Sequence, residues 1–225
     1  MASRPIFLPK RSKRAFVREV SVEFKWFAGM AASQKQKSID SLHAAAQQRL
    51  GLDKILEISS KSRVELGVKL SAFNLNAPVA GRIISVEVAF QASKVFENGG
   101  PYIDLLEGTS REAKGDPRLK ASGRLMAFSF EEEMWPLEPR TAFYDWIYLR
   151  ALQANTDLAR QLLDYEAFTD IEFNPDKSIN CQAQSAALYV SLHREGLLSA
   201  AMASKDTFLA CLQEASTEKQ QQNLF

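Results

Sequence analysis

The chain has 225 residues, of which 46% are hydrophobic and 24% are charged. These values are ordinary for a globular protein, and a chain of this length can bury a sizeable core without disulfides. Its 28 basic and 27 acidic side chains leave a net charge of +1. This balance excludes a strong global attraction to nucleic acid or membrane, so any such partner requires a local charged patch.

Cysteine content and hydropathy indicate the compartment. Cys181 and Cys211 are the two cysteines, too few for a secreted disulfide scaffold, and they favour the reducing cytosol. No apolar run approaches the ~20 residues that cross a membrane. The N-terminal Met-Ala-Ser-Arg-Pro lacks the apolar stretch of a signal peptide. We therefore expect a cytoplasmic protein with no membrane partner.

The first fifty residues combine a basic segment, a strand and a helix. Residues 1–16 contain proline and several basic side chains, which predicts a solvated arm, with contact to nucleic-acid phosphate as the alternative. Residues 33–50 show helical spacing of apolar side chains, and Gly51 is placed to end that helix. Between the basic segment and this helix, apolar and polar residues alternate. This period of two predicts a half-buried strand with apolar positions at Val20, Val22, Phe24 and Trp26.

The middle of the chain contains a helix bounded by turn residues. Residues 55–58 form a short, mostly apolar run that predicts a second strand, and Pro78 and Gly81 mark a loop. A helix is predicted over 85–96, ended by Asn98-Gly99-Gly100-Pro101. The polar stretch 107–120 is predicted to form a loop or short helices.

The last third is mainly helical. A strand at Asp170–Phe173 is predicted to lead into an Asn174-Pro175-Asp176 turn. Residues 216–225 form a polar tail, and we expect it to be frayed. Helices are predicted over four ranges, at about 139–152, 157–165, 182–195 and 203–215.

No internal repeat and no second compositional regime divides the chain. The economical prediction is one mainly α domain with a small β element, of α+β class, over 17–215. The arm at 1–16 and the tail at 216–225 flank this domain.

Common metal and nucleotide motifs are missing from the sequence. His43 and His193 are the two histidines, and neither has zinc-ligand spacing to a cysteine. There is no phosphate-loop motif, dinucleotide-binding glycine pattern or nucleophile elbow. We expect no metal and no cofactor, and we interpret His43 as a satisfied helix histidine.

The predicted helix at 85–96 has one notable polar face. Ser85 is a suitable N-cap, and Glu87, Gln91 and Lys94 stand at i, i+4 and i+7, so they line one side beside an apolar stripe. A carboxylate, an amide and an amine aligned along a cleft can perform acid–base or nucleophilic chemistry. The alternative is a solvated, salt-bridging surface, and spacing alone favours that alternative.

The residues on this helix resemble a known signature. The pattern Glu-x-x-Phe-Gln-Ala-x-Lys over Glu87–Lys94 resembles the signature helix of the NADAR superfamily (YbiA-like proteins). Leu70-Ser71-Ala72-Phe73 resembles the Leu-Ser-Asn-Phe segment that precedes it. Further segments resemble the family in the same order from about residue 55 to 195: Trp135, Arg140, Asn155, Leu162-Leu163 and Ile171-Glu172 with Asp176.

One branch, the NADAR antitoxins encoded beside DarT toxins, is more similar still. Segments that resemble this branch include Trp26 with Ala31–Lys37, Leu56-Glu57-Ile58-Ser59, Gly99-Gly100-Pro101-Tyr102 and Pro117–Lys120 with Gly123-Arg124-Leu125. Two departures stand out. Ala72 replaces the usual Asn, although Asn74 follows two residues later, and Ser178-Ile179-Asn180-Cys181 replaces a Trp-Gly-rich stretch.

The resemblance implies a NADAR-like fold and cleavage of an N-glycosidic bond. DarT-associated members remove ADP-ribose from guanine bases in DNA, so the implied substrate is ADP-ribosylated DNA and the implied partner is a cognate DarT-type toxin. Carried over by position, Glu87 and Lys94 become the catalytic pair. The implied substrate contacts are Lys61, Ser71, Phe73, Asn74, Phe90, Gln91, Trp135 and Asp176.

Several roles and functions stay open. Glu87 is able to supply a proton or activate water, and Lys94 is able to form a Schiff base with a ring-opened sugar or only to bind a hydroxyl or phosphate. The alternative functions are an N-glycosidase for a small N-riboside, as in riboflavin-associated members, and a non-catalytic binder of ADP-ribosylated nucleic acid. Candidate cations for the pyrophosphate are Lys61, Arg63, Lys69, Arg111 and Arg124.

Overall fold

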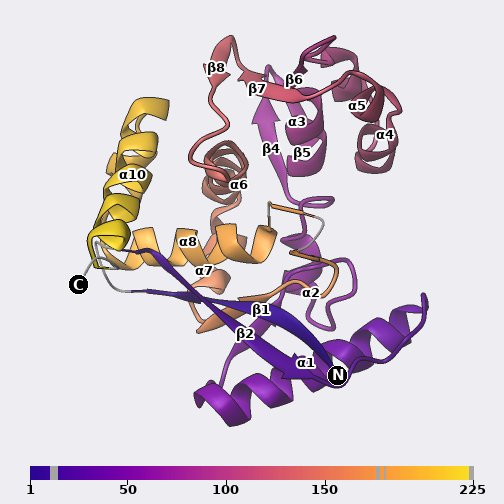
Figure 1. Ribbon diagram of the computed structural model, residues 1–225, viewed down its shortest axis with the longest axis vertical. Helices are drawn as coiled ribbons and strands as arrows, with labels where there is room; N and C mark the ends of the chain where they lie inside the picture. The colour runs from indigo at the N-terminus through magenta and orange to yellow at the C-terminus, as the bar shows by residue number, and fades with distance from the viewer. Residues whose placement is uncertain (11–14, 176–177, 180, 223–225) are drawn as a thin grey trace. The chain divides into compact units, whose positions relative to one another are not determined.

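The computed structural model describes residues 1–10, 15–175, 178–179 and 181–222, with side chains through Glu214 (Figure 1). Helices and small sheets alternate along the chain, which confirms the predicted α+β class. The contacts form two compact units. Unit 1 comprises Met1–Ser71 and Asp157–Phe225, and unit 2 comprises Ala72–Thr156. A single domain over 17–215 stays a prediction.

Unit 1 contains a four-stranded sheet in the order β2-β1-β9-β3. β1 (Ala2–Pro9) and β2 (Val17–Phe24) pair antiparallel along their whole length, as Figure 1 shows. β9 (Ala167–Thr169) is antiparallel to β1 and parallel to β3 (Ile55–Glu57). The strands expected around Val22 and at 55–58 are therefore confirmed.

Two expectations at this sheet were wrong. Residues 2–9 were expected in a solvated arm, but they form β1, because Ile6 and Phe7 are fully buried against the rest of unit 1. Of the basic cluster, Lys10 is described, and Arg11, Lys13 and Arg14 lie outside the described residues. The expected strand at 170–173 is a turn, in which the N–H groups of Glu172 and Phe173 donate to Asp170 Oδ1 at 3.0 and 3.2 Å.

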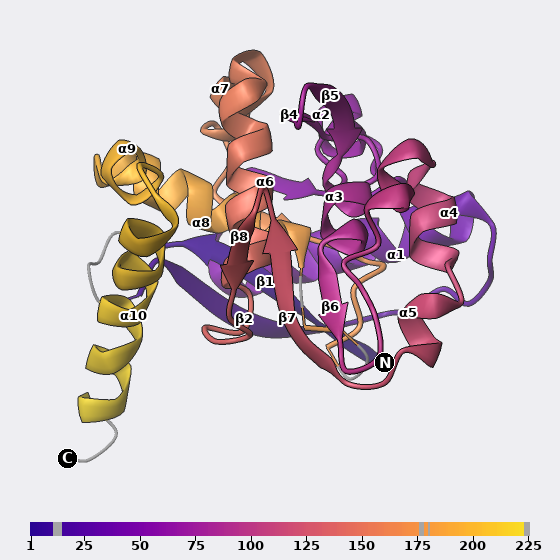
Figure 2. The same ribbon diagram turned by 90° about the horizontal axis from the view of Figure 1, so that it is seen from above.

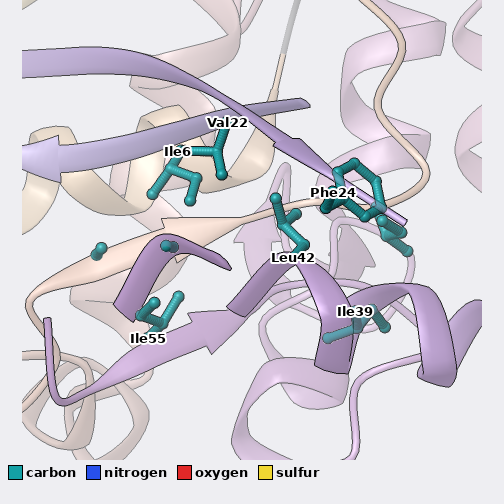
Figure 3. Packing of buried hydrophobic residues seen from close by; sticks show 9 residues of the cluster. Ile6, Val22, Phe24, Ile39, Leu42 and Ile55 are labelled. Atoms are coloured by element: carbon teal, nitrogen blue, oxygen red, sulfur yellow. The ribbon is translucent and has the colours of Figure 1, made fainter. Parts of the chain in front are cut away.

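Helix α1 (Ala32–Leu50) covers the β1–β2 hairpin and confirms the first predicted helix. Gly51 ends it with φ 65°, a left-handed conformation that glycine adopts without strain. Side chains from the two strands and from the helix meet in one apolar cluster (Figure 3). Its buried members are Ile6, Val22, Phe24, Ile39, Leu42, Ala46, Ile55, Ala167 and Ile171.

A buried polar network joins β3 to β9. Thr169 Oγ1 donates to Glu57 Oε2 at 2.7 Å, and the N–H of Ile171 donates to Glu57 Oε1 at 2.8 Å. His43 Nε2 then donates to Thr169 Oγ1 at 2.8 Å, because the threonine hydrogen is already engaged. Burial raises the pKa of Glu57 and lowers the pKa of His43 to about 4, so the ring is neutral. The interpretation of His43 as a satisfied helix histidine is confirmed.

Three further helices of unit 1 confirm predicted ones: α7 (Thr156–Leu162), α8 (Gln182–Arg194) and α10 (Lys205–Gln222). The unit also contains the short helices α2 (Glu65–Lys69) and α9 (Leu198–Ala201). α8 contacts β1 and β9. α10 extends to residue 222, so most of the expected frayed tail is helical. Across the described part of the chain, no helix combines the length and apolarity needed to cross a membrane.

Unit 2 surrounds helix α3 (Val86–Ala92) with two small sheets and further helices. β4 (Asn76–Val79) and β5 (Arg82–Ser85) form a hairpin where a loop was expected, because Ala80 and Gly81 both take positive φ in a tight turn. The second sheet has the order β6-β7-β8 (Figure 2). Its strands are β6 (Lys94–Phe96), β7 (Leu125–Phe130) and β8 (Glu133–Trp135).

Short helices fill the polar stretch 107–120, as expected. η1 (Ile103–Glu107), α4 (Ser110–Gly115) and α5 (Arg118–Ala121) follow one another there. α6 (Ala142–Ala154) then packs against α3 and β4, and it starts three residues later than the helix predicted from Pro139.

The predicted helix at 85–96 is partly wrong. The structure ends α3 at Ala92, and Lys94 begins β6 instead of a third helical turn. The cause is strand pairing, since Lys94 lies opposite Phe128 and Val95 opposite Ala127 on β7. Valine and phenylalanine at 95 and 96 suit this pleated, half-buried position better than a helix.

Candidate active site

Helix α3 is held firmly at its start and buried along its length. The Ser85 hydroxyl accepts the N–H of Val88 at 3.2 Å, which confirms the predicted N-cap. The backbone N–H of Glu87 donates to the carbonyl of Ala72 at 2.9 Å. Every residue from Val86 to Ala92 is buried. The polar side chains of this helix are therefore buried, and the alternative prediction of a solvated, salt-bridging surface is wrong for them.

Glu87, Gln91 and Lys94 form a continuous chain of hydrogen bonds. Gln91 Nε2 donates to Glu87 Oε1 at 2.9 Å, and Lys94 Nζ donates to Gln91 Oε1 at 2.7 Å. The amide thus links the carboxylate to the amine, with one end of its dipole facing each. The structure brings these three residues together although Lys94 lies on a strand and not on the helix.

Lys94 lies in a partly apolar position that favours its uncharged form. Its Nζ is 4.7 Å from the centre of the Phe90 ring. The pKa of Lys94 is lowered to about 8, because burial and, to a smaller extent, the nearby charge of Lys114 outweigh the opposing effect of Glu87. At pH 7.5 roughly a quarter of such amines are uncharged, against about one in a thousand for an ordinary lysine. A nucleophilic amine is therefore well populated near neutral pH.

Lys114 is a site residue that the sequence analysis missed. It lies on α4, with Nζ 3.7 Å from Glu87 Oε1 and 5.0 Å from the centre of the Phe73 ring. One signal was present in the sequence. Thr109-Ser110-Arg111-Glu112 has the spacing of a capping box, and the structure contains that box at the start of α4. The contact with Glu87 itself depends on tertiary packing and has no local signal.

Phe73 and Phe90 lie beside this cluster in different settings. Phe73 is 38% exposed and offers an accessible ring. Phe90 is 7% exposed and packs on Phe128, Phe143 and Tyr144, with ring centres 5.2 to 6.2 Å apart. Phe90 therefore forms the apolar floor under Lys94.

The other predicted substrate contacts lie in several places. Trp135 is 1% exposed and packs on Phe143 and Trp146, which supports a role in the core of unit 2. Asn74 is exposed in unit 2. Lys61 and Ser71 belong to unit 1, where Lys61 Nζ donates to Ser60 Oγ at 3.0 Å and Ser71 is 2% exposed. Asp176 lies outside the described residues. Substrate contact by these residues stays a prediction.

A salt-bridged segment next to α4 orders the loop after β6. The Arg118 guanidinium lies 4.4 Å from the centre of the Tyr102 ring and donates to both Asp104 and Asp116. These bonds hold the pKa of both carboxyls below their usual range. Among the described side chains, no group of three or more His, Cys, Asp or Glu is arranged to hold a metal.

Comparison with protein families gives a match over nearly the whole chain. A family model described as DarT1-associated NADAR antitoxin matches residues 2–222, nearly the whole chain. No curated protein matches it.

Proposed function

The chain belongs to the DarT1-associated NADAR antitoxins, and on that premise we propose that it hydrolyses the N-glycosidic bond between ADP-ribose and guanine in DNA. In this role it reverses the modification made by a DarT-type toxin. The observation that carries the proposal is the relay Glu87–Gln91–Lys94, with an amine whose pKa is about 8 at one end and a buried carboxylate at the other.

Lys94 is the proposed nucleophile. When the ribose ring opens, its C1 is bonded to the guanine nitrogen as an imine, and the uncharged amine attacks that carbon. The bond between C1 and guanine breaks, the amine protons pass to the departing guanine nitrogen, and C1 stays on Lys94 as a Schiff base. Water then adds to C1, which releases ADP-ribose as the aldehyde and restores the amine.

Glu87 is the proposed proton carrier. Its Oε1 accepts a hydrogen bond from Gln91 and lies near the Lys114 ammonium, and these two contacts hold the carboxylate in position for proton transfer. It takes a proton as the amine attacks and passes it to guanine. Later it takes a proton from the attacking water and passes it to the Lys94 nitrogen, which restores the amine and the carboxylate. Phe73, exposed beside Lys114, is the proposed stacking surface for a base.

The direct test uses pure, folded protein and DNA that carries ADP-ribose on guanine. Release of free ADP-ribose with restoration of unmodified guanine is expected. No release at enzyme excess contradicts the proposal, and release from small N-ribosides alone supports the small-molecule alternative. Binding of modified DNA without any release supports the non-catalytic binder. The cytoplasm is the proposed location, where the toxin's DNA substrate lies.

The pH dependence follows from the amine. Lys94 attacks only when it is uncharged, so kcat/KM at subsaturating modified DNA is expected to rise with pH and to level off above a midpoint near 8. A rise of about tenfold per pH unit is expected well below that midpoint. Initial rates measured in constant ionic strength buffers check this. If kcat/KM does not change across the same pH range, deprotonation of Lys94 does not limit the rate, and this prediction is wrong.

A further inference from the structure

Lys114 contacts Glu87, the carboxylate at one end of the Glu87–Gln91–Lys94 hydrogen-bond chain. It lies on α4, whereas Glu87 lies on α3. Its Nζ lies 3.7 Å from Glu87 Oε1, and its side chain is 59% exposed while that of Glu87 is 8% exposed. The exposed Phe73 ring lies under the ammonium at 5.0 Å. Lys114 therefore contacts Glu87 from the solvent side, while Gln91 contacts it from within α3.

The position of Lys114 is fixed by packing and not by the lysine itself. α3 and α4 are in direct contact. Ser110 at the start of α4 bonds the Ser85 hydroxyl at 2.7 Å and the carbonyl of Phe73 at 3.1 Å. The capping box of Thr109 and Glu112 sets the helix start independently. A substitution at position 114 thus leaves the α3–α4 packing in place.

We propose that Lys114 is a positioning residue, which holds the Glu87 carboxylate by ion pairing and, as a second cation, disfavours the charged form of Lys94. This inference rests on the proposed function, since it concerns the same pair. The charged groups that act on Lys94 are Glu87 from α3 and Lys114 from α4. Gln91 and the Phe90 ring contribute neutral contacts, and the partner of Lys94 across the sheet is Phe128.

The physical argument is a balance of two opposite charges. Glu87 attracts a proton to Lys94, whereas Lys114 repels one and also draws the Glu87 charge toward itself. Without Lys114 both effects are lost, and the pKa of the Lys94 amine rises. At pH 7 the uncharged fraction of Lys94 is expected to fall about three- to tenfold, the size of effect that one partly screened charge produces.

The experiment measures the Lys94 amine directly in the ligand-free full chain. Acetylation of Lys94 by a brief pulse of acetic anhydride is followed by mass spectrometry across pH values on both sides of its pKa of about 8. Lys114→Gln is expected to move the midpoint upward, and Lys114→Arg is expected to keep it. Lys120→Gln is the matched control, because it removes the charge of an exposed lysine in the same unit. Thermal melts verify folding.

Each outcome decides the inference separately from the proposed function. An unmoved midpoint in Lys114→Gln overturns it, as does an equal shift in Lys114→Arg or Lys120→Gln. A higher KM with an unmoved midpoint assigns Lys114 to substrate binding and also overturns it. The labelling does not require turnover, so it decides the role of Lys114 even if the parent protein releases no ADP-ribose. If the parent is active, kcat/KM at pH 7 should fall by the same three- to tenfold as the uncharged fraction.

Discussion

Lys94→Ala is expected to lower kcat for ADP-ribose release by about a thousandfold or more, since it removes the proposed nucleophile. Binding of modified DNA should change little, because Gln91, Glu87 and Phe73 remain. Fold is not at risk, since Lys94 is partly exposed and its strand pairing uses the backbone. Single-turnover release and equilibrium binding, measured on the same preparations, check both halves of this expectation.

A second variant separates the two roles that the sequence left open for Lys94. Lys94→Arg keeps a positive charge but does not lose its proton near neutral pH, so it cannot form a Schiff base. Turnover by Lys94→Arg near the parent rate would show that position 94 only binds. Borohydride added during turnover should trap the sugar on Lys94 as a stable adduct in the parent chain. An unmodified Lys94 under conditions that inactivate the enzyme would count against the covalent route.

Glu87→Gln is expected to lower kcat by about a hundred- to a thousandfold while the fold is preserved, because the amide fills the same space but cannot accept and release a proton near neutral pH. The charge of Glu87 raises the pKa of Lys94. Removing it should therefore move the acetylation midpoint of Lys94 downward and increase the uncharged amine. Activity should fall even though the nucleophile becomes more available.

The Glu87→Gln variant is informative because its activity is expected to fall while the uncharged fraction of Lys94 rises. A loss of turnover with a lowered midpoint assigns proton transfer to Glu87 itself. A loss accompanied by an unchanged or raised midpoint would mean that the substitution acted on Lys94 or on the structure. Glu133→Gln, an exposed glutamate on β8 in the same unit, is the matched control for the change in charge.

Local features of the sequence predicted most of the helices. Helix α1 and its end at Gly51 follow from apolar spacing and a glycine stop, both readable within one segment. The face shared by Glu87 and Gln91 follows from the helical period. These features need no knowledge of distant residues, and the structure confirms them.

The errors occur where distant segments decide the conformation. Lys94–Phe96 has helical spacing, but it pairs with β7, whose residues come about thirty positions later. Lys114 acquires its role only when α4 packs against α3. Trp135 packs among aromatic rings in the core of unit 2, a setting that depends on Phe143 and Trp146 of a later helix and that its local sequence does not reveal.

The order of strands in unit 1 has a consequence for synthesis on the ribosome. β9 lies between β1 and β3 in the sheet, but it comes much later in the chain than either of them. The hydrogen bond between Thr169 on β9 and Glu57 on β3 joins residues 112 positions apart. The N-terminal hairpin and α1 therefore emerge long before the strand that connects β1 to β3. Until then the edge of β1 that will pair with β9 carries unpaired backbone groups, the kind of surface that promotes association between nascent chains. A chain interrupted before residue 167 would keep that edge open and leave Glu57 without the threonine hydroxyl that satisfies it.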